Sequence, residues 1–145
     1  MRRLFDTSVL VAAMVAAHPA HERSVRCFEH ALSDDGELLV CTHSLAELYA
    51  VLTRLPVSPR ISPGSARRLI RENLEVDPVR LVPLEASDYL AVLDRMTEFG
   101  FPGGVIYDAL ILHTACRAEV DEVVTLNESD FVRLSFGLSV RIVAP

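Results

Sequence analysis

Five short apolar runs alternate along this sequence with longer segments whose apolar residues recur at helical spacing. The runs span residues 3–5, 37–41, 80–84, 122–126 and 139–143. Strands that alternate with helices form parallel sheets, because each helix returns the chain to the edge where the next strand begins. Helices then cover both faces of the sheet. The sequence therefore predicts an α/β fold, a three-layer α/β/α sandwich with a mostly parallel central sheet.

The helices are predicted from apolar spacing, caps and breakers. They span residues 8–17, 21–32, 45–55, 63–74, 88–99, 105–118 and 131–134. The expected caps are Thr42 or Ser44, Ser62 and Ser87, and Gly100 is expected to stop the helix at 88–99. In that helix the inward side chains are expected to be Tyr89, Leu90, Leu93 and Met96. A turn is predicted at residues 34–36, and Pro83 favours a strand at the sheet edge or the end of that strand.

Chain length and hydropathy place further limits on this protein. Its 145 residues fit a single domain, residues 1–145, and half of them are hydrophobic with a mean hydropathy of +0.30. Charged residues interrupt each apolar run before the ~18 residues that a membrane span needs. Asp6 also interrupts the segment that a signal peptide would require. We therefore expect a cytoplasmic protein without a membrane contact, whose three cysteines are reduced.

Acidic or amide side chains stand among apolar residues at four places in the chain. These residues are Asp6, Glu47, Asp108 and Asn127 with Asp130. Most have a structural explanation as a helix cap or as a favourable charge in a first helical turn. Glu47 does not, because it lies mid-helix without a basic residue four positions later. Asp6 directly follows the first strand, at the edge where α/β proteins bind ligands.

Considered together, these side chains indicate a metal site. Carboxylates that lie close together repel one another and raise their own pKa values, and a bound cation relieves this repulsion. Oxygen ligands select a hard ion, Mg²⁺ or Mn²⁺, in preference to zinc. The histidines compete poorly with this scheme: His30 and His113 have no partner at metal-binding spacing, and His18 and His21 flank a Pro-Ala turn. His43 is at best a neighbour of the ligands and not a ligand itself. Such an ion can activate water and stabilise the leaving oxygen of a phosphodiester.

The charge distribution allows one basic surface on an acidic molecule. The formal net charge is −6, which argues against general nucleic-acid binding. Basic residues nevertheless cluster in one stretch without an acid before Glu72, at Arg54, Arg60, Arg67, Arg68 and Arg71. A solvated helix face is the simpler interpretation of this stretch, and a contact for nucleic acid is the alternative.

Across essentially the whole chain, the sequence resembles the PIN-domain ribonucleases, and within them the VapC-type toxins of toxin–antitoxin pairs. The matching pieces are residues 4–8 around Asp6, residues 44–49 around Glu47, residues 107–109 around Asp108, and residues 124–127 with Asp130 and Phe131. Each piece is weak alone, but four in the right order form a specific signal.

The resemblance implies an endoribonuclease whose acidic metal site is Asp6, Glu47 and Asp108, with Mg²⁺ or Mn²⁺ as cofactor. It implies RNA as substrate and an antitoxin protein as partner. At the fourth acidic position many members have Asp where this chain has Asn127. Either Asn127 is a neutral ligand or Asp130 supplies the charge. Further candidate substrate-binding residues are Thr7, Ser8, Thr125, Arg60, Arg67, Arg68 and Arg71.

Two other functions compete with this interpretation. A haloacid-dehalogenase-type phosphatase would use Asp6 as a nucleophile and needs a second aspartate at the position of Ser8. A catalytically weakened PIN fold would bind RNA or protein without cutting, although the intact Asp6, Glu47 and Asp108 speak against it. The high apolar fraction predicts exposed apolar surface and hence a homodimer that also binds an apolar antitoxin helix, with an arginine or other polar group of the antitoxin reaching the acids.

Overall fold

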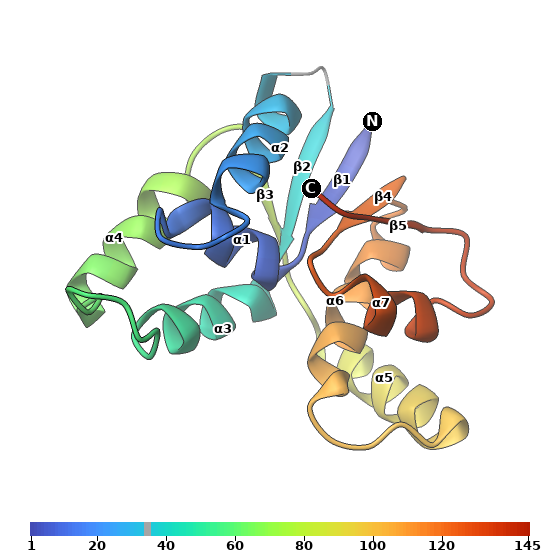
Figure 1. Cartoon of the computed structure of the whole chain (residues 1–145). Coiled ribbons are helices and arrows are strands. Elements are labelled where there is room, and N and C mark those ends of the chain that lie inside the picture. Colours follow the sequence, from blue (N-terminus) through green and yellow to red (C-terminus); the bar gives the residue numbers. More distant parts are fainter. Residues whose placement is uncertain (34–35) are drawn as a thin grey trace.

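Figure 1 shows the fold in a computed structural model that describes residues 1–33 and 36–145. The strands form one sheet in the order β3-β2-β1-β4-β5, and every neighbouring pair is parallel. They are β1 (Arg2–Phe5), β2 (Glu37–Cys41), β3 (Val79–Val82), β4 (Glu122–Val124) and β5 (Arg141–Val143). The predicted turn falls on Asp34 and Asp35, which lie outside the described residues.

Helices cover both faces of this sheet (Figure 1). On one face lie α1 (Thr7–Met14), α2 (His21–Ser33), α3 (Thr42–Leu52) and α4 (Pro63–Leu74). On the other lie α5 (Ala86–Phe99), α6 (Val105–Arg117) and α7 (Glu128–Leu134). The predicted three-layer α/β/α sandwich is confirmed. Among the described helices, none is long and apolar enough to cross a membrane.

Strand alternation divides the apolar residues between two cores. Leu4 of β1 and Leu39 of β2 pack under α5, α6 and α7, whereas Phe5 and Leu38 pack under α1 to α4. This division follows from the period of two along a strand, which sends successive side chains to opposite faces. Both faces of the central strands are therefore covered by helices and shielded from water. Polar side chains lie instead in the loops at the strand ends.

Several sequence-based boundaries are confirmed. Ser62 caps α4 by accepting a hydrogen bond from the Ser65 amide, with Pro63 in the first turn. Gly100 ends α5 with a left-handed φ of 68°, a conformation that glycine adopts without strain. Pro83 follows the last residue of β3, which is an edge strand.

Two predicted caps are wrong. Neither Thr42 nor Ser44 caps α3, because β2 runs directly into that helix and Cys41 occupies the cap position without a side-chain hydrogen bond. Ser87 does not cap α5 either, since the cap position is two residues earlier, at Glu85, which forms a reciprocal capping box with Asp88. The first helix is also shorter than predicted and ends at Met14, well before Pro19.

The inward face predicted for α5 is largely wrong. Met96 is buried as expected, but Leu90 and Leu93 are 61% and 49% exposed, and Tyr89 is exposed as well. The helix instead buries Asp88 and Val92. Asp88 is drawn inward by His113 and Arg117 of α6, so a charged residue sets the rotation of the helix.

Candidate active site

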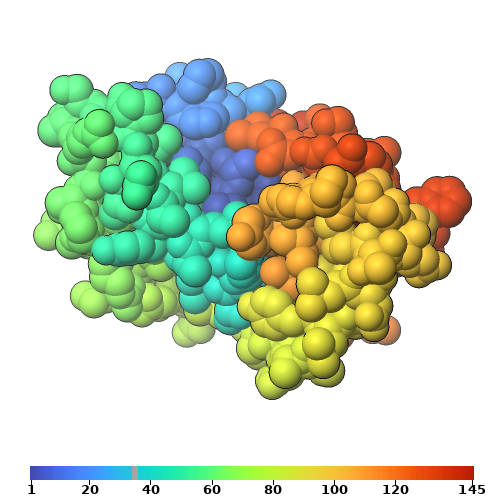
Figure 2. Space-filling model, turned by 90° about the horizontal axis from the view of Figure 1, so that it is seen from below, coloured from blue at the N-terminus to red at the C-terminus, as the bar shows by residue number. Residues whose placement is uncertain are grey.

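A pocket of about 600 Å³ opens where the carboxyl ends of β1, β2 and β4 meet. Helices α1, α3 and α7 begin at this edge because each follows one of these strands. Figure 2 looks onto the edge and shows a hollow with the dark-blue N-terminal segment at its floor. The predicted site residues that border the pocket are Asp6, Thr7, Ser8, Glu47, Asp108 and Asn127. The fold therefore brings together residues that are far apart in the sequence.

Asp6 forms the buried floor of this pocket. It occupies the cap position of α1, yet its side chain makes no capping hydrogen bond, and only 2% of the residue is exposed. Its Oδ2 atom accepts hydrogen bonds from Ser8 Oγ at 2.5 Å and from Thr125 Oγ1 at 2.8 Å. Burial raises the pKa of Asp6, and the two hydroxyls partly offset that rise. The Asp6 carboxylate is therefore held chiefly by these two hydroxyls.

The hydroxyls of Ser8 and Thr125 also fix the loop after β4. Ser8 Oγ accepts from the Leu126 amide at 3.0 Å, and Thr125 Oγ1 accepts from the Asn127 amide at 2.9 Å. Each hydroxyl thus donates to Asp6 and accepts from the backbone, which uses both its donor and an acceptor site. Both residues hold the Asp6 carboxylate and the β4–α7 loop in one arrangement.

Glu47 reaches the pocket from the middle of α3. Its Oε1 atom lies 3.4 Å from Thr7 Oγ1 and 3.4 Å from Nε2 of His43, one helical turn earlier. The His43 ring stacks on Tyr107 with centroids 5.2 Å apart, and burial lowers the pKa of His43. Burial raises the pKa of Glu47, and the negative charge of Asp6 raises it further. A neutral imidazole beside Glu47 leaves the carboxylate charge uncompensated.

Asp108 lies in the first turn of α6, and its carboxyl group is strongly perturbed. Its pKa is raised to about 7, first by burial and then by the charges of Asp6, Asp130 and Glu47. These couplings indicate that the four carboxylates share one electrostatic environment. The carboxylates surround the pocket without closing on a common point, and no group of three metal-binding side chains in the described chain is already close enough to hold an ion.

The donor set nevertheless fits a hard divalent cation. The pocket supplies carboxylate oxygens, which Mg²⁺ and Mn²⁺ prefer, and no cysteine or neighbouring histidine pair that would favour zinc. Burial raises the pKa values of all three carboxyl groups, and repulsion adds to the rise at Glu47 and Asp108. A bound cation would relieve both effects.

Asn127 and Asp130 occupy different positions beside the site. Asn127 is exposed and borders the pocket itself. Asp130 is half-buried, lies 3.4 Å from Arg133 on the same helix, and raises the pKa of Asp108. Asn127 therefore has the better position for a ligand, whereas Asp130 adds negative charge from the side.

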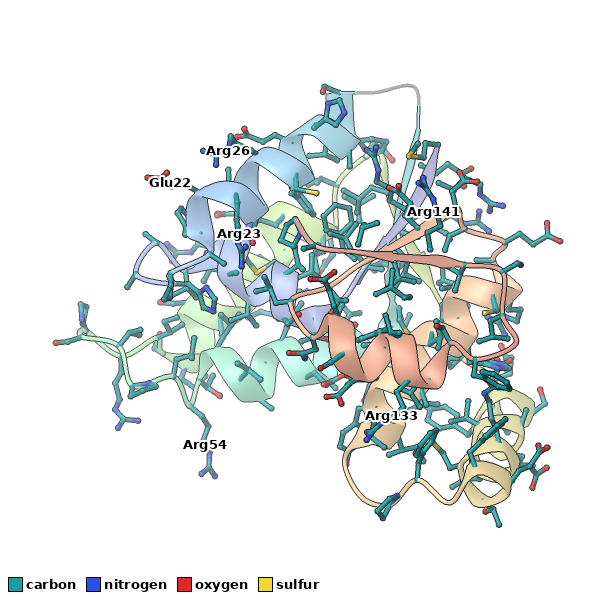
Figure 3. The ribbon with its side chains drawn as sticks, turned by 45° about the vertical axis from the view of Figure 1, so that its right-hand side comes forward. Glu22, Arg23, Arg26, Arg54, Arg133 and Arg141 are labelled. Atoms are coloured by element: carbon teal, nitrogen blue, oxygen red, sulfur yellow. The ribbon has the colours of Figure 1, made fainter. Side chains whose placement is uncertain are left out.

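The basic stretch lies away from the pocket lining. None of Arg60, Arg67, Arg68 and Arg71 is among the described residues that border the pocket. Arg67 is paired with Glu75 through two hydrogen bonds of 2.5 and 3.2 Å. Figure 3 shows Arg54 extending from the end of α3 away from the rest of the molecule. A role of this stretch in substrate binding stays a prediction.

His18 and Arg23 border the acidic pocket and were missed by the sequence argument. In the sequence, His18 merely flanks a Pro-Ala turn, and Arg23 does not stand out among the polar residues around it. The early end of α1 explains why these two residues border the pocket. Because α1 is short, α2 begins near the carboxyl edge of the sheet. The start of α2 and the turn before it therefore contribute four residues to the pocket lining: His18, Pro19, Ala20 and Arg23.

Comparison with known sequences identifies similar proteins over most of the chain. The family described as PIN domain matches residues 3–137. The protein named Ribonuclease VapC27, from Mycobacterium tuberculosis, is 37% identical over 117 residues, which cover 79% of each chain. Ribonuclease VapC40 from the same species is 34% identical over 113 residues, 78% of each chain.

Solved structures show the same fold at low sequence identity. M. tuberculosis VapC20, described as a Sarcin-Ricin loop cleaving toxin, superposes with a TM-score of 0.73 at 17% identity, over 96% of this chain and 98% of its own. The DNA-bound VapBC of Salmonella typhimurium gives 0.69 at 19% identity, over 99% and 98%. VapBC2 of Rickettsia felis, bound to a promoter DNA fragment, gives 0.68 at 17% identity with the same coverage.

Proposed function

The chain belongs to the PIN-domain family, and we propose that it is an endoribonuclease that hydrolyses RNA phosphodiester bonds as the toxin of a toxin–antitoxin pair. Its relatives at 34–37% identity are named ribonucleases, and they match over nearly four fifths of the chain. The observation that carries the proposal is the pocket at the strand ends, which Asp6 borders from the end of β1, Glu47 from α3 and Asp108 from α6.

We propose that Asp6, Glu47 and Asp108 hold a Mg²⁺ or Mn²⁺ ion, with Asn127 as a neutral neighbour. When bound, such an ion supplies Lewis-acid polarisation of the phosphate and lowers the pKa of water. Ser8 and Thr125 engage one oxygen of Asp6 and orient the carboxylate, so the second oxygen is left for the pocket. Thr7 and His43 flank Glu47 and limit its rotation. The chain thus provides a preorganised, negatively charged receptor.

Charge-neutral substitutions test this assignment. Asp6→Asn, Glu47→Gln and Asp108→Asn each keep the size of the side chain and remove one charge. We expect each variant to lose cleavage of labelled RNA by orders of magnitude and to lose most of the Mn²⁺-induced rise in melting temperature. Glu128→Gln, an exposed acid on α7 outside the pocket, is the control and should behave as the wild type. Cleavage that survives in Asp6→Asn in proportion to its folded fraction would contradict the proposal.

The same assay separates the competing functions. A weakened PIN fold would bind RNA without cutting it, and a phosphatase would release phosphate from small monoesters.

The fourth acidic position is tested by comparing Asn127→Ala with Asp130→Asn. We expect the larger loss of Mn²⁺ affinity in Asn127→Ala, because Asn127 borders the pocket.

We propose an antitoxin and a second copy of the chain as protein partners. The structural neighbours include VapBC complexes, which supports the antitoxin. Exposed Tyr89, Leu90 and Leu93 on α5 support a homodimer, since adjacent apolar side chains on a surface mark interfaces. Light scattering should give a dimer for the wild type and a monomer for Leu90→Glu with Leu93→Glu. A wild-type monomer would contradict the homodimer. If the double variant stays dimeric but no longer binds the antitoxin, this face is the antitoxin interface instead.

A further inference from the structure

One wall of the acidic pocket is basic, and the proposed function gives it no role. The wall consists of the turn between α1 and α2 and the first turn of α2, where His18 and Arg23 border the pocket. Helix α2 leads back to the amino end of β2, so its own first turn lies near the carboxyl edge of the sheet. The acids at the end of β1, on α3 and on α6 therefore share one pocket with a guanidinium and an imidazole.

Arg23 has no ion pair or hydrogen bond with any residue in the described part of the chain, although it shares a pocket with three carboxylates. Its neighbour Arg26 is different, because it lies 3.8 Å from Glu22 on the same helix and does not border the pocket. In Figure 3, Glu22 and Arg26 project outward from α2, and Arg23 lies on another side of the helix. The five N–H donors of Arg23 are therefore free to meet a ligand.

His18 adds an oriented donor to the same wall. Its Nδ1 atom accepts a hydrogen bond from the Ala20 amide at 3.1 Å. A neutral imidazole that accepts at Nδ1 carries its proton at Nε2, so the second ring nitrogen is a donor. His18 is half-buried and borders the pocket, which restricts where this donor can lie.

The pocket is also larger than an ion requires. A volume of about 600 Å³ falls in the range of ~300–1,000 Å³ typical of ligand sites. A ligand that satisfies both walls needs anionic oxygens that can face a cation on one side and N–H donors on the other. A phosphodiester has two non-bridging oxygens and fits both requirements, and arginine recognises phosphate through paired N–H donors.

We propose that Arg23, with His18 beside it, binds the RNA backbone phosphate at the reaction site and positions it against Asp6, Glu47 and Asp108. This inference rests on the proposed ribonuclease function and names the residues that bind its substrate. The contact recognises the backbone and is therefore independent of base sequence. It also places a phosphate contact on α2, in the pocket that the residues of the basic stretch do not border.

The test compares Arg23→Ala, Arg23→Lys and the control Arg26→Ala. We expect Arg23→Ala to lower kcat/KM for a labelled RNA roughly tenfold to a hundredfold, as loss of a charge-assisted hydrogen bond does. The slope of log affinity against log salt should fall by about one, because one phosphate contact is lost. Arg23→Lys should restore the salt slope but only part of kcat/KM, since a lysine lacks the paired donors. Arg26→Ala should match the wild type.

Metal binding provides the readout that excludes a structural role. The Mn²⁺-induced rise in melting temperature should be unchanged or larger in Arg23→Ala, because that variant lacks a positive charge beside the acids. Equal losses in Arg23→Ala and Arg26→Ala would overturn the assignment in favour of a general charge effect. A wild-type kcat/KM in Arg23→Ala would overturn the inference and leave the ribonuclease proposal standing. A wild-type protein that neither binds nor cuts RNA would overturn both.

Discussion

Thr125 shows how one hydroxyl holds the proposed active site together. The residue is fully buried, and its Oγ1 donates to Asp6 and accepts from the Asn127 amide. A group that loses its partner inside the protein is costly because no water replaces it. Thr125 therefore couples the stability of the β4–α7 loop to the orientation of the Asp6 carboxylate.

We predict that Thr125→Val, which keeps the shape of the side chain, lowers the free energy of unfolding by roughly 1–3 kcal/mol. The loss arises because the Asn127 amide and Asp6 Oδ2 each lose a partner. Urea denaturation measures the stability, and RNA cleavage should fall further than the folded fraction explains. Thr125→Ser keeps the hydroxyl and should retain most of both properties. Equal stability of the valine and serine variants would show that the hydroxyl is not needed.

Single residues also show the limit of sequence reasoning about the site. Asp6, Glu47 and Asp108 could be predicted because a charged side chain among apolar neighbours is visible locally, and all three do border one pocket. Arg23 could not, because it lies among other polar residues on an amphipathic helix. Its importance depends only on where α2 begins in space, which is a tertiary property.

Helix α5 shows why the apolar pattern predicted a helix correctly but not its buried face. Apolar residues at both 89–90 and 92–93 allow two rotations of the helix with similar apolar burial. Asp88 decides between them, since its carboxylate accepts from the Glu85 amide at 2.7 Å and from His113 and Arg117 of α6. The partners of Asp88 on α6 lie 25 and 29 residues away in the sequence, beyond any local pattern.

We predict that Asp88→Ala destabilises the protein by roughly 2–4 kcal/mol, because it removes half of the capping box and leaves Arg117 without its acid. The Glu85 amide, followed by His113 and Arg117, holds the pKa of Asp88 below its usual value, so this contribution should persist down to about pH 4. Denaturant titration of Asp88→Ala against Asp94→Ala, an exposed acid of the same helix, checks the expectation. Comparable effects of the two substitutions would show that Asp88 has no special role.

At the scale of the whole molecule, positive charge that can contact RNA lies both at the pocket, with Arg23, and on the exposed basic stretch outside it. The chain carries a net charge of −6, so a basic surface must act locally against a repulsive background. We predict that replacing Arg60, Arg68 and Arg71 together by Ala lowers RNA affinity and its salt dependence while kcat at saturating RNA stays unchanged. The reason is that these exposed arginines lie outside the pocket. An unchanged salt slope would assign them to a solvated helix face.

The stability of the whole protein should depend on pH and on metal. Burial raises the pKa values of Asp6, Glu47 and Asp108, and neighbouring carboxylates raise those of Glu47 and Asp108 further, the last to about 7, against ~4 in an unfolded chain. Between these values the folded state binds more protons than the unfolded state. The contribution of these groups to the free energy of unfolding therefore decreases as the pH rises from about 4 to 7.

Comparison of the wild type with Asp108→Asn isolates this contribution, because His43 and the other titrating groups are present in both proteins. Without metal, the wild type should lose roughly 1–3 kcal/mol relative to Asp108→Asn between pH 4.5 and 7.5. Mn²⁺ binds the deprotonated carboxylates, so its stabilisation of the wild type should be greatest near pH 8 and small near pH 5. Thermal unfolding with and without Mn²⁺ across this range measures both effects. If the two metal-free proteins show parallel pH profiles, Asp108 does not titrate in this window and the carboxylates are not coupled as the structure indicates.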